Sequence, residues 1–245
     1  MTASVIDAFG RCVGEYLTGR PDYPEALLED LPRAALVVDL GAGTGKFTRL
    51  VSRTGARVVA VEPQSAMAAH IARDANVQVV VATAEQIPLA GGCVDLVCCA
   101  TAFHWFDYAK ATAEVARILK PGAHLALIWN VRDDRVPWVA AVGALLDARG
   151  KEAHRYRKDR WRAILDDCRF AYLGARDHPF THRMPVDGIV DRVLSTSFIA
   201  ALGQEERETI RKQVFAIIGA HPELRQAREI RFPYVAKLYL LRSQS

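Results

Sequence analysis

The residues best suited to hold a ligand lie in one short glycine-rich segment. Asp39 and Leu40 are followed by Gly41-Ala42-Gly43-Thr44-Gly45, directly after an apolar run. Glycine adopts positive φ at little cost and lets a ligand come close to the backbone. In open α/β sheets a turn of this kind lies at the carboxyl ends of the strands, where ligands bind. The segment therefore predicts a ligand-binding loop.

Two common phosphate-binding loops fit this segment poorly. A P-loop has the pattern GxxxxGK followed by Ser or Thr, but Phe47 stands at the hydroxyl position and Leu40 at the first glycine. A dinucleotide loop needs a small residue at the third position of GxGxxG, where this chain has Lys46. A long side chain there would push the helix away from the strand. An oxidoreductase that uses a nicotinamide cofactor is kept only as an alternative.

An acidic residue follows the next apolar run. Glu62 comes directly after Val58–Val61 and lies 17 residues beyond Gly45. This is close to the spacing at which an acidic residue binds a ribose diol in nucleotide sites. Glu62 is therefore predicted to bind a ribose.

The elements that position these residues alternate along the first half of the chain. Short and predominantly apolar runs, separated by helical stretches, are typical of a parallel sheet covered on both faces. Right-handed crossovers then produce a doubly wound sheet. Strands are predicted over residues 36–40, 57–61, 77–81, 94–100 and 125–129, and helices over 46–54, 67–73 and 108–119, the last stopped by Lys120-Pro121-Gly122.

The pattern changes after Val131. Helices are predicted over residues 138–146, 155–166, 186–194 and 205–218, and strands over 178–183 and 234–241. We expect one domain over residues 1–245, with a helical elaboration after the fifth strand.

The composition is that of a globular protein, with 51% hydrophobic and 24% charged residues. No apolar run approaches the roughly 18 residues of a membrane helix, and Asp7 and Arg11 interrupt any secretory signal. The 5 cysteines show no CxxC pair and no zinc-type spacing. We expect them to be small buried apolar residues in a cytoplasmic protein with no metal site and no membrane partner.

The net charge of +4 comes from one stretch, residues 151–162, because the basic and acidic residues elsewhere balance. Nucleic-acid binders usually spread positive charge over a face. We therefore expect no nucleic-acid partner, and we interpret the basic stretch as a solvated helix face rather than as a site that attracts an acidic substrate. The oligomeric state cannot be predicted from the sequence.

The order of motifs resembles class I S-adenosylmethionine-dependent methyltransferases of the type 11 branch. The segment from Asp39 to Gly45 is similar to motif I of that family. Three later segments also resemble the family: Ala82-Thr83-Ala84-Glu85-Gln86-Ile87-Pro88-Leu89, Val94-Asp95-Leu96-Val97 and Arg117-Ile118-Leu119-Lys120-Pro121-Gly122. Ala102-Phe103-His104-Trp105-Phe106 and the segment from Tyr16 to Pro24 resemble the subset that includes trans-aconitate-type methyltransferases. The resemblance covers about residues 16–130.

This resemblance implies an α/β, Rossmann-like fold: a seven-stranded, mostly parallel sheet with an antiparallel last strand. It implies a cofactor-binding core over residues 1–130 and an acceptor-covering elaboration over 131–230. The implied reaction is methyl transfer from S-adenosylmethionine to an O, N or C atom of a small-molecule acceptor, which releases S-adenosylhomocysteine. A non-catalytic module that binds S-adenosylmethionine is the second alternative.

The resemblance also assigns the cofactor site. Asp39 is expected near the methionine amino group, Glu62 at the ribose and Gln64 at the ribose or the edge of the ring. The family often has Asp where this chain has Thr83, so Glu85 or a backbone carbonyl must replace its contact with adenine. The full set of implied cofactor residues is Asp39, Gly41, Ala42, Gly43, Glu62, Gln64, Thr83, Ala84, Glu85 and Thr101.

His104 is the one candidate catalytic residue. It follows the fourth strand, where an acceptor would meet the methyl group, and histidine can act as a general base near neutral pH. The competing interpretation is a structural histidine between Phe103 and Trp105. Tyr16 and Arg20 are further candidates to contact the cofactor carboxylate.

Overall fold

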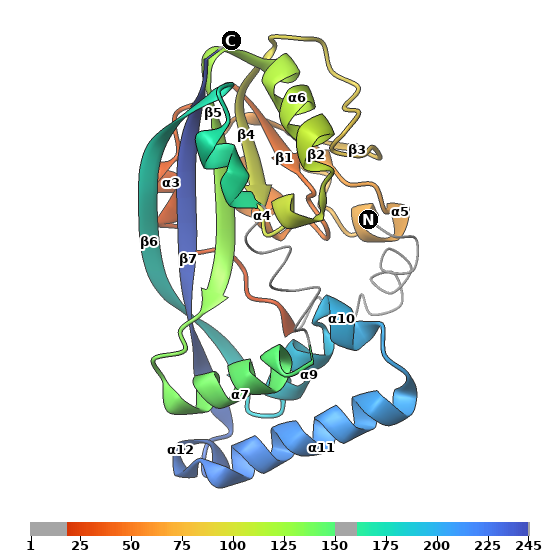
Figure 1. Cartoon of the computed structure of the whole chain (residues 1–245), viewed down its shortest axis with the longest axis vertical. Helices are drawn as coiled ribbons and strands as arrows, with labels where there is room; N and C mark the ends of the chain where they lie inside the picture. Colours follow the sequence, from red (N-terminus) through yellow and green to blue (C-terminus); the bar gives the residue numbers. More distant parts are fainter. Residues whose placement is uncertain (1–18, 150–160, 245) are drawn as a thin grey trace. The chain divides into compact units, whose positions relative to one another are not determined.

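The computed structural model describes residues 19–149 and 161–244, which form two compact units (Figure 1). The larger unit consists of residues 23–130, 161–178 and 236–244. The smaller unit consists of residues 19–22, 131–149 and 179–235. Tyr16 and most of the basic stretch 151–162 lie outside the described residues.

The larger unit carries the glycine loop and the strands around it. Its strands are β1 (Leu36–Leu40), β2 (Arg57–Val61), β3 (Val77–Val80) and β4 (Val94–Ala100). Its helices are α3 (Leu27–Asp30), α4 (Lys46–Ser52), α5 (Ser65–Ala68), α6 (Tyr108–Ile118) and the 3-10 helices η1 (Phe103–Trp105) and η2 (Trp161–Asp166).

Three long strands have residues in both units: β5 (Leu119–Arg132), β6 (Phe170–Pro185) and β7 (Glu229–Ser243). The helices of the smaller unit are α7 (Pro137–Asp147), α9 (Gly188–Leu194), α10 (Ser197–Ala200), α11 (Gln204–Ala220) and α12 (Pro222–Arg225). None of the helices in the described part is long and apolar enough to cross a membrane.

The seven strands form one sheet in the order β3-β2-β1-β4-β5-β7-β6. The pairs β1–β2, β2–β3, β1–β4 and β4–β5 are parallel, and the last strands are antiparallel. The predicted fold is therefore confirmed. In this order β2 lies on one side of β1 and β4 lies on the other. The direction in which the strands are added therefore reverses between β1 and β4, and this position is the switch point of the sheet. Ligands of doubly wound sheets bind at the carboxyl ends of the strands beside such a point.

Alternation along β1 places its side chains on opposite faces of the sheet. Val38 and Leu40 belong to the hydrophobic core that also contains residues of α6 and η2. Asp39 points to the other face, where it contacts Thr48 of α4. The smaller unit has its own core, built around residues such as Trp138, Ile189 and Tyr234, but the division of the chain into core and elaboration stays a prediction.

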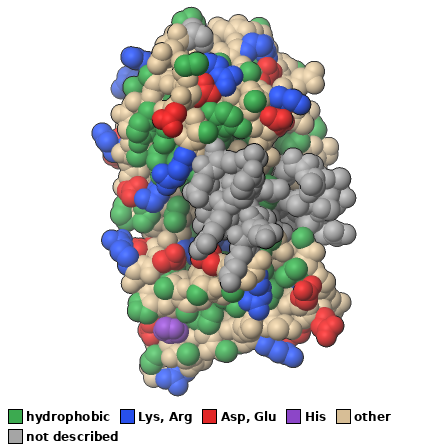
Figure 2. Space-filling view, viewed as in Figure 1, with side chains coloured by type: hydrophobic (Ala, Val, Ile, Leu, Met, Phe, Trp, Pro, Cys, Tyr) green, Lys and Arg blue, Asp and Glu red, His purple; other side chains and the backbone are tan. Residues whose placement is uncertain are grey.

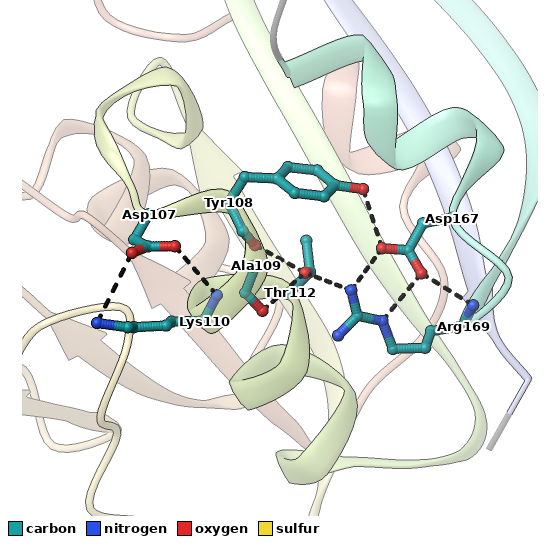
Figure 3. Close-up of polar contacts among 7 residues, drawn as sticks. All are labelled: Asp107, Tyr108, Ala109, Lys110, Thr112, Asp167 and Arg169. Carbon is teal, nitrogen blue, oxygen red and sulfur yellow. Dashed lines mark hydrogen bonds and ion pairs between the residues drawn. The ribbon is translucent and has the colours of Figure 1, made fainter.

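A polar network joins α6 to the segment that follows η2 (Figure 3). The Tyr108 hydroxyl donates to Asp167 at 2.9 Å, and Arg169 donates to both oxygens of that carboxylate at 2.9 and 2.7 Å. Arg169 also donates to the Thr112 hydroxyl at 2.7 Å. The guanidinium lowers the pKa of Asp167 to about 2. Because these bonds fix the segment after η2 beside α6, they help to position η2, which begins at Trp161.

Several predicted elements differ from the structure. The helix predicted over 67–73 is α5, which begins at Ser65 and ends at Ala68. The chain then folds back, and Ile71 packs so close to the glycine loop that a Cβ on Gly45 would meet it at 3.1 Å. The expected helix over 155–166 is described only at its end, as η2, because its first residues lie outside the described part.

The helix predicted over 108–119 is α6, which ends at Ile118, so the stop before Lys120-Pro121-Gly122 is confirmed. These three residues do not form a turn outside the sheet, because they belong to β5. Leu119 pairs with Val94, and His124 pairs with Leu96, so the intervening residues form a bulge in the strand. Bulges place extra residues in one strand while the ladder continues.

The described cysteines are free of disulfides, but they are not all buried. Cys98 and Cys99 are buried in β4, as expected, whereas Cys93 is partly buried and Cys168 is exposed. The prediction of a buried role was therefore wrong for Cys168. On the face drawn in Figure 2, basic and acidic side chains are interspersed among apolar and uncharged polar ones.

Candidate functional site

The glycine loop is fixed by backbone bonds to the end of β2. The N–H groups of Gly41 and Ala42 both donate to the carbonyl of Val61, at 2.8 and 3.0 Å. Gly41, Gly43 and Gly45 have φ values of 74°, 58° and 80°. Residues other than glycine rarely adopt such conformations, so the predicted need for glycine in this loop has a backbone reason.

Gly41 is also required by a close approach within the protein. A Cβ at this position would lie 2.5 Å from the Cβ of Ala102 and 3.2 Å from the ring of Phe106. The loop after β1 therefore packs directly on the segment after β4. A side chain at Gly41 would separate the two carboxyl ends that border the switch point.

Glu62 joins the end of β2 to the glycine loop. Its Oε2 accepts from the Gly43 N–H at 2.9 Å and its Oε1 from the Gln64 N–H at 3.0 Å. The residue is 6% exposed, and this burial raises the pKa of its carboxyl, while the two backbone N–H groups oppose the rise. A carboxylate has about four acceptor positions. Both oxygens therefore keep acceptor capacity for a ligand.

Asp39 is the most deeply buried acid of this site, with 0% exposure. The Thr48 hydroxyl donates to Oδ2 at 2.6 Å, whereas Oδ1 is buried with no hydrogen-bond partner among the described residues. Burial raises the pKa of Asp39 to about 7, and the nearby Glu62 adds to the rise. The Thr44 hydroxyl of the loop is likewise buried without a partner in the described part of the chain. Unpartnered buried polar atoms are rare and call for an explanation such as a ligand.

The segment after β3 supplies the other expected contacts. Thr83 is exposed and Ala84 is buried, and Thr83 forms a short bridge with Gln86. Oε1 of Glu85 accepts from the Asp107 N–H at 2.9 Å. Glu85 therefore braces the start of α6, so its expected contact with adenine would have to be made by its remaining acceptor positions.

Thr101 directly follows the last residue of β4 and has a strained backbone conformation. Its φ of 58° makes it the single non-glycine residue with positive φ in the described ranges. Its hydroxyl accepts from the Tyr23 hydroxyl at 3.0 Å, and the Tyr23 ring packs edge-on against Phe47 of α4. Backbone strain of this kind tends to occur at functional sites.

His104 lies in η1, just beyond the end of β4, and is partly buried. The Trp129 indole N–H donates to His104 Nδ1 at 3.5 Å. The Trp129 ring packs against that of Trp161 of η2 in a tilted arrangement, with the ring centroids 4.3 Å apart. An indole N–H only donates, so a neutral imidazole in this contact carries its proton on Nε2. The geometry thus favours His104 as a hydrogen-bond donor through Nε2.

Some residues of this site give only a weak signal in the sequence. The position of Thr48, on the first turns of α4 nine residues after Asp39, could have been found from helix geometry. Tyr23 and Trp129 are distant in sequence from the residues they contact, so no local pattern indicates them. Arg20 belongs to the smaller unit, where its Nη2 donates to the Ser195 carbonyl at 3.0 Å. Residues 19–149 and 161–244 contain no group of three His, Cys, Asp or Glu side chains that could hold a metal ion.

Comparisons with known proteins point in one direction. Residues 38–127 match the family described as methyltransferase domain. The chain is 38% identical over 232 residues to an uncharacterised methyltransferase of Mycobacterium tuberculosis, covering 93% of this chain and 92% of that protein. It is 41% identical over 105 residues to the dimethylglycine N-methyltransferase of Parasynechococcus marenigrum, covering 39% of this chain and 38% of that protein. A solved structure from Anaeromyxobacter dehalogenans, assigned to the type II methyltransferases, matches with a TM-score of 0.63 and 26% identity, over 91% of this chain and 96% of that one.

Proposed function

Because the chain belongs to the class I S-adenosylmethionine-dependent methyltransferases, we propose that it methylates a small-molecule acceptor. The chain is an enzyme of this class and its cofactor is S-adenosylmethionine. Both alternatives from the sequence, a nicotinamide-dependent oxidoreductase and a non-catalytic binding module, are therefore set aside.

The residues at the carboxyl ends of β1 and β2 fit this cofactor. S-adenosylmethionine carries an ammonium group and a sulfonium, both cationic, and a ribose with two hydroxyl donors. Asp39 Oδ1 is a buried acceptor without a partner in the described residues, and Glu62 keeps acceptor capacity on both oxygens. We assign Asp39 to the ammonium end and Glu62 to the ribose hydroxyls, and we keep Gln64, Thr83, Ala84, Glu85 and Thr101 as proposed contacts around the rest of the cofactor.

When bound, S-adenosylmethionine supplies an activated methyl group, and its transfer to a nucleophile leaves S-adenosylhomocysteine. Alignment of the reacting groups lowers much of the barrier to such a displacement. The task of this chain is therefore to orient the cofactor and the acceptor and to exclude water. The glycine loop and Glu62 orient the cofactor, and His104 Nε2 is proposed to donate to an acceptor oxygen rather than to remove a proton.

The small-molecule acceptor is supported by one named relative and by two motifs. The relative from Parasynechococcus marenigrum is named for dimethylglycine, which is a small carboxylate. The segments Ala102–Phe106 and Tyr16–Pro24 resemble the trans-aconitate-type subset, whose membership we propose for this chain. The cytoplasm is the compartment we propose, on the ground of the free cysteines in the described part.

We also propose that residues 131–230 carry the choice of acceptor. The family match covers residues 38–127 and leaves these residues out, and binding diversity usually resides in variable segments on a fixed scaffold. Exchange of 131–230 with the same part of a relative is expected to change the acceptor and to preserve affinity for the cofactor. Loss of cofactor affinity in a folded chimera would contradict this division.

The proposal depends most on the contact between Glu62, at the end of β2, and the ribose of the cofactor. The variant Glu62→Ala tests this contact. Two charge-assisted bonds to the ribose are each worth about 1.5–3 kcal/mol. We expect S-adenosylmethionine to bind roughly 100- to 10,000-fold more weakly, measured by titration calorimetry. Methyl transfer is followed as release of S-adenosylhomocysteine with a panel of small carboxylates, amines and alcohols.

Two further variants separate binding from folding. Glu29→Ala removes an exposed acid of the same unit and is expected to leave affinity unchanged. Glu62→Gln keeps the size of the side chain but sets its NH2 group against one of the two backbone N–H groups of Gly43 and Gln64, so its melting temperature measures how much these contacts contribute to folding. Unchanged cofactor affinity in Glu62→Ala would refute the assignment of Glu62, and absence of turnover with every small molecule would refute the acceptor class.

A further inference from the structure

Two arginine side chains of the smaller unit are largely removed from solvent, and neither has a carboxylate within hydrogen-bond distance among the described residues. Arg192, on α9, is 5% exposed. Arg132, the last residue of β5, has a side chain that is 13% exposed. Arginine is almost never fully buried unless it is paired with an acid, because the cost of removing the charge from water must be offset. This pair therefore calls for a counter-charge.

The partners of Arg192 are neutral. Its Nε donates to the Tyr234 hydroxyl at 2.6 Å and its Nη1 to the Thr196 hydroxyl at 3.3 Å. Within the described ranges, Arg192 forms no ion pair. Tyr234 is itself held by stacking on Phe180 and Phe232, at 5.5 and 4.9 Å. The guanidinium is thus oriented by a rigid aromatic group, but its charge is not balanced.

Arg132 is also poorly compensated. Its Nε is buried and has no hydrogen-bond partner in the part of the chain that the structure describes. The nearest carboxylate oxygen, Oδ1 of Asp134, lies 3.8 Å away on a side chain that is 57% exposed. Burial lowers the pKa of Arg132, and the positive charge of Arg192 lowers it further, against weaker opposing effects from Asp134 and Asp147. The Asp133 N–H donates to the Pro233 carbonyl at 3.1 Å, which places Arg132 beside the part of β7 that carries Tyr234, the partner of Arg192. Two like charges on neighbouring strand and helix segments repel each other.

The end of α9 balances only part of this charge. Arg192 lies in the last turn of α9, and a helix C-terminus carries about half of a negative elementary charge. Arg20 already donates to the Ser195 carbonyl at this helix end. A single helix end cannot neutralise two further guanidiniums, so most of their charge needs another partner.

We propose that Arg132 and Arg192 form a binding site for a small oxyanion, either a carboxylate or a phosphate group. A guanidinium is a planar fork of donors that matches the oxygens of both groups. An anion between the two arginines would satisfy the unpartnered Nε of Arg132 and relieve the repulsion between the two charges. The site lies within the smaller unit, and the inference does not depend on the nature of the methyl acceptor.

The test is the thermal stability of the full chain with citrate or inorganic phosphate, compared with sodium chloride at the same ionic strength. A ligand that binds only the folded state raises the melting temperature in a saturable way, by roughly 5 °C at a hundred times its dissociation constant for a chain of this size. We expect such a rise at millimolar citrate or phosphate. A rise with citrate alone identifies a carboxylate site, and a rise with phosphate alone identifies a phosphate site.

Matched variants locate the effect. Arg132→Gln removes a side chain that makes no hydrogen bond among the described residues, so this variant should fold, and it should abolish the anion-dependent rise. In chloride its melting temperature should equal or exceed that of the unmodified chain, because an unbalanced charge is lost. Arg183→Gln removes an exposed arginine paired with Glu229 in the same unit and should preserve the rise.

Arg192→Lys keeps the charge but loses the planar arrangement of donors. This variant should bind the anion at least 10-fold more weakly. Three results would overturn the site: no rise beyond that in chloride, a rise that survives in Arg132→Gln, or a lower melting temperature of Arg132→Gln in chloride. The last result would mean that Arg132 is a structural brace. Cofactor affinity, measured in parallel, shows whether a failure concerns this site or the methyltransferase function.

Discussion

The buried carboxyl of Asp39 makes the stability of this protein depend on pH in an unusual direction. Burial raises its pKa from 3.8 to about 7. In the unfolded chain the group loses its proton near its ordinary pKa. Between these two values the folded protein therefore binds more protons than the unfolded chain, so folding becomes less favourable as the pH rises.

The magnitude follows from the shift. Each pKa unit corresponds to 1.36 kcal/mol, so a rise of about 3 units destabilises the protein by about 4 kcal/mol above pH 7 and by nothing below the unfolded pKa. Asp39→Asn removes the charge and keeps an acceptor for the Thr48 hydroxyl. We expect this variant to exceed the unmodified chain in stability by about 4 kcal/mol at pH 8, with the gap narrowing by roughly 1.4 kcal/mol per unit toward pH 5.

Urea unfolding at several pH values between 5 and 8 measures the difference in free energy of unfolding between Asp39→Asn and the unmodified chain. Asp95→Asn is the control of opposite sign, because Lys120 lowers the pKa of Asp95 and its removal should destabilise the protein at neutral pH. A gap for Asp39→Asn that is the same at pH 5 and pH 8 would refute the reasoning, since it would mean that Asp39 is ionised in the folded protein throughout.

The same carboxyl couples cofactor binding to pH. A cationic group bound at Asp39 favours its ionised form, so binding of S-adenosylmethionine should release a proton near pH 6. Calorimetry in two buffers of different ionisation enthalpy measures this release. Asp39→Asn should bind more weakly and release no proton from this position. Proton release that persists in the variant would assign it to another group.

Two other predictions concern the loop after β1 and the segment after β4. Gly41→Ala should lower the melting temperature more than Gly55→Ala, because both glycines have positive φ but only Gly41 would meet a neighbouring atom, at 2.5 Å; equal losses would show that the close packing on Ala102 is unimportant. His104→Ala should lower turnover by less than about 100-fold, the lower range for a general base, because the Nδ1 lone pair already accepts from Trp129. A larger drop with unchanged cofactor affinity would show that His104 acts as the base.

The sequence alone determined the features that depend on neighbours along the chain. Apolar runs separated by helical stretches predicted β1, β2 and β4 at their observed residues, since a parallel strand covered on both faces needs a predominantly apolar run. The Asp39–Gly45 segment predicted the loop, because positive φ favours glycine wherever the chain folds. The spacing to Glu62 likewise placed an acid at the end of the neighbouring strand.

Tertiary structure decided whatever depends on residues that are distant in sequence. Gly41 is restricted by Ala102, Glu85 is committed to the start of α6, and the Nδ1 atom of His104 is occupied by Trp129. The raised pKa of Asp39 also needs the full burial that only the packed sheet and α4 provide. None of these contacts follows a period of two or 3.6 residues, so no local pattern could indicate them.

The two arginines illustrate the same limit. In the sequence Arg132 and Arg192 are 60 residues apart and look like any other surface cations. Arg192 is buried because α9 and β7 converge in one core of the smaller unit, and Arg132 has an exposed Asp134 at 3.8 Å as its nearest carboxylate among the described residues. Charge composition is a property of the sequence, but the cost of a charge depends on what surrounds it, and only the folded chain determines that.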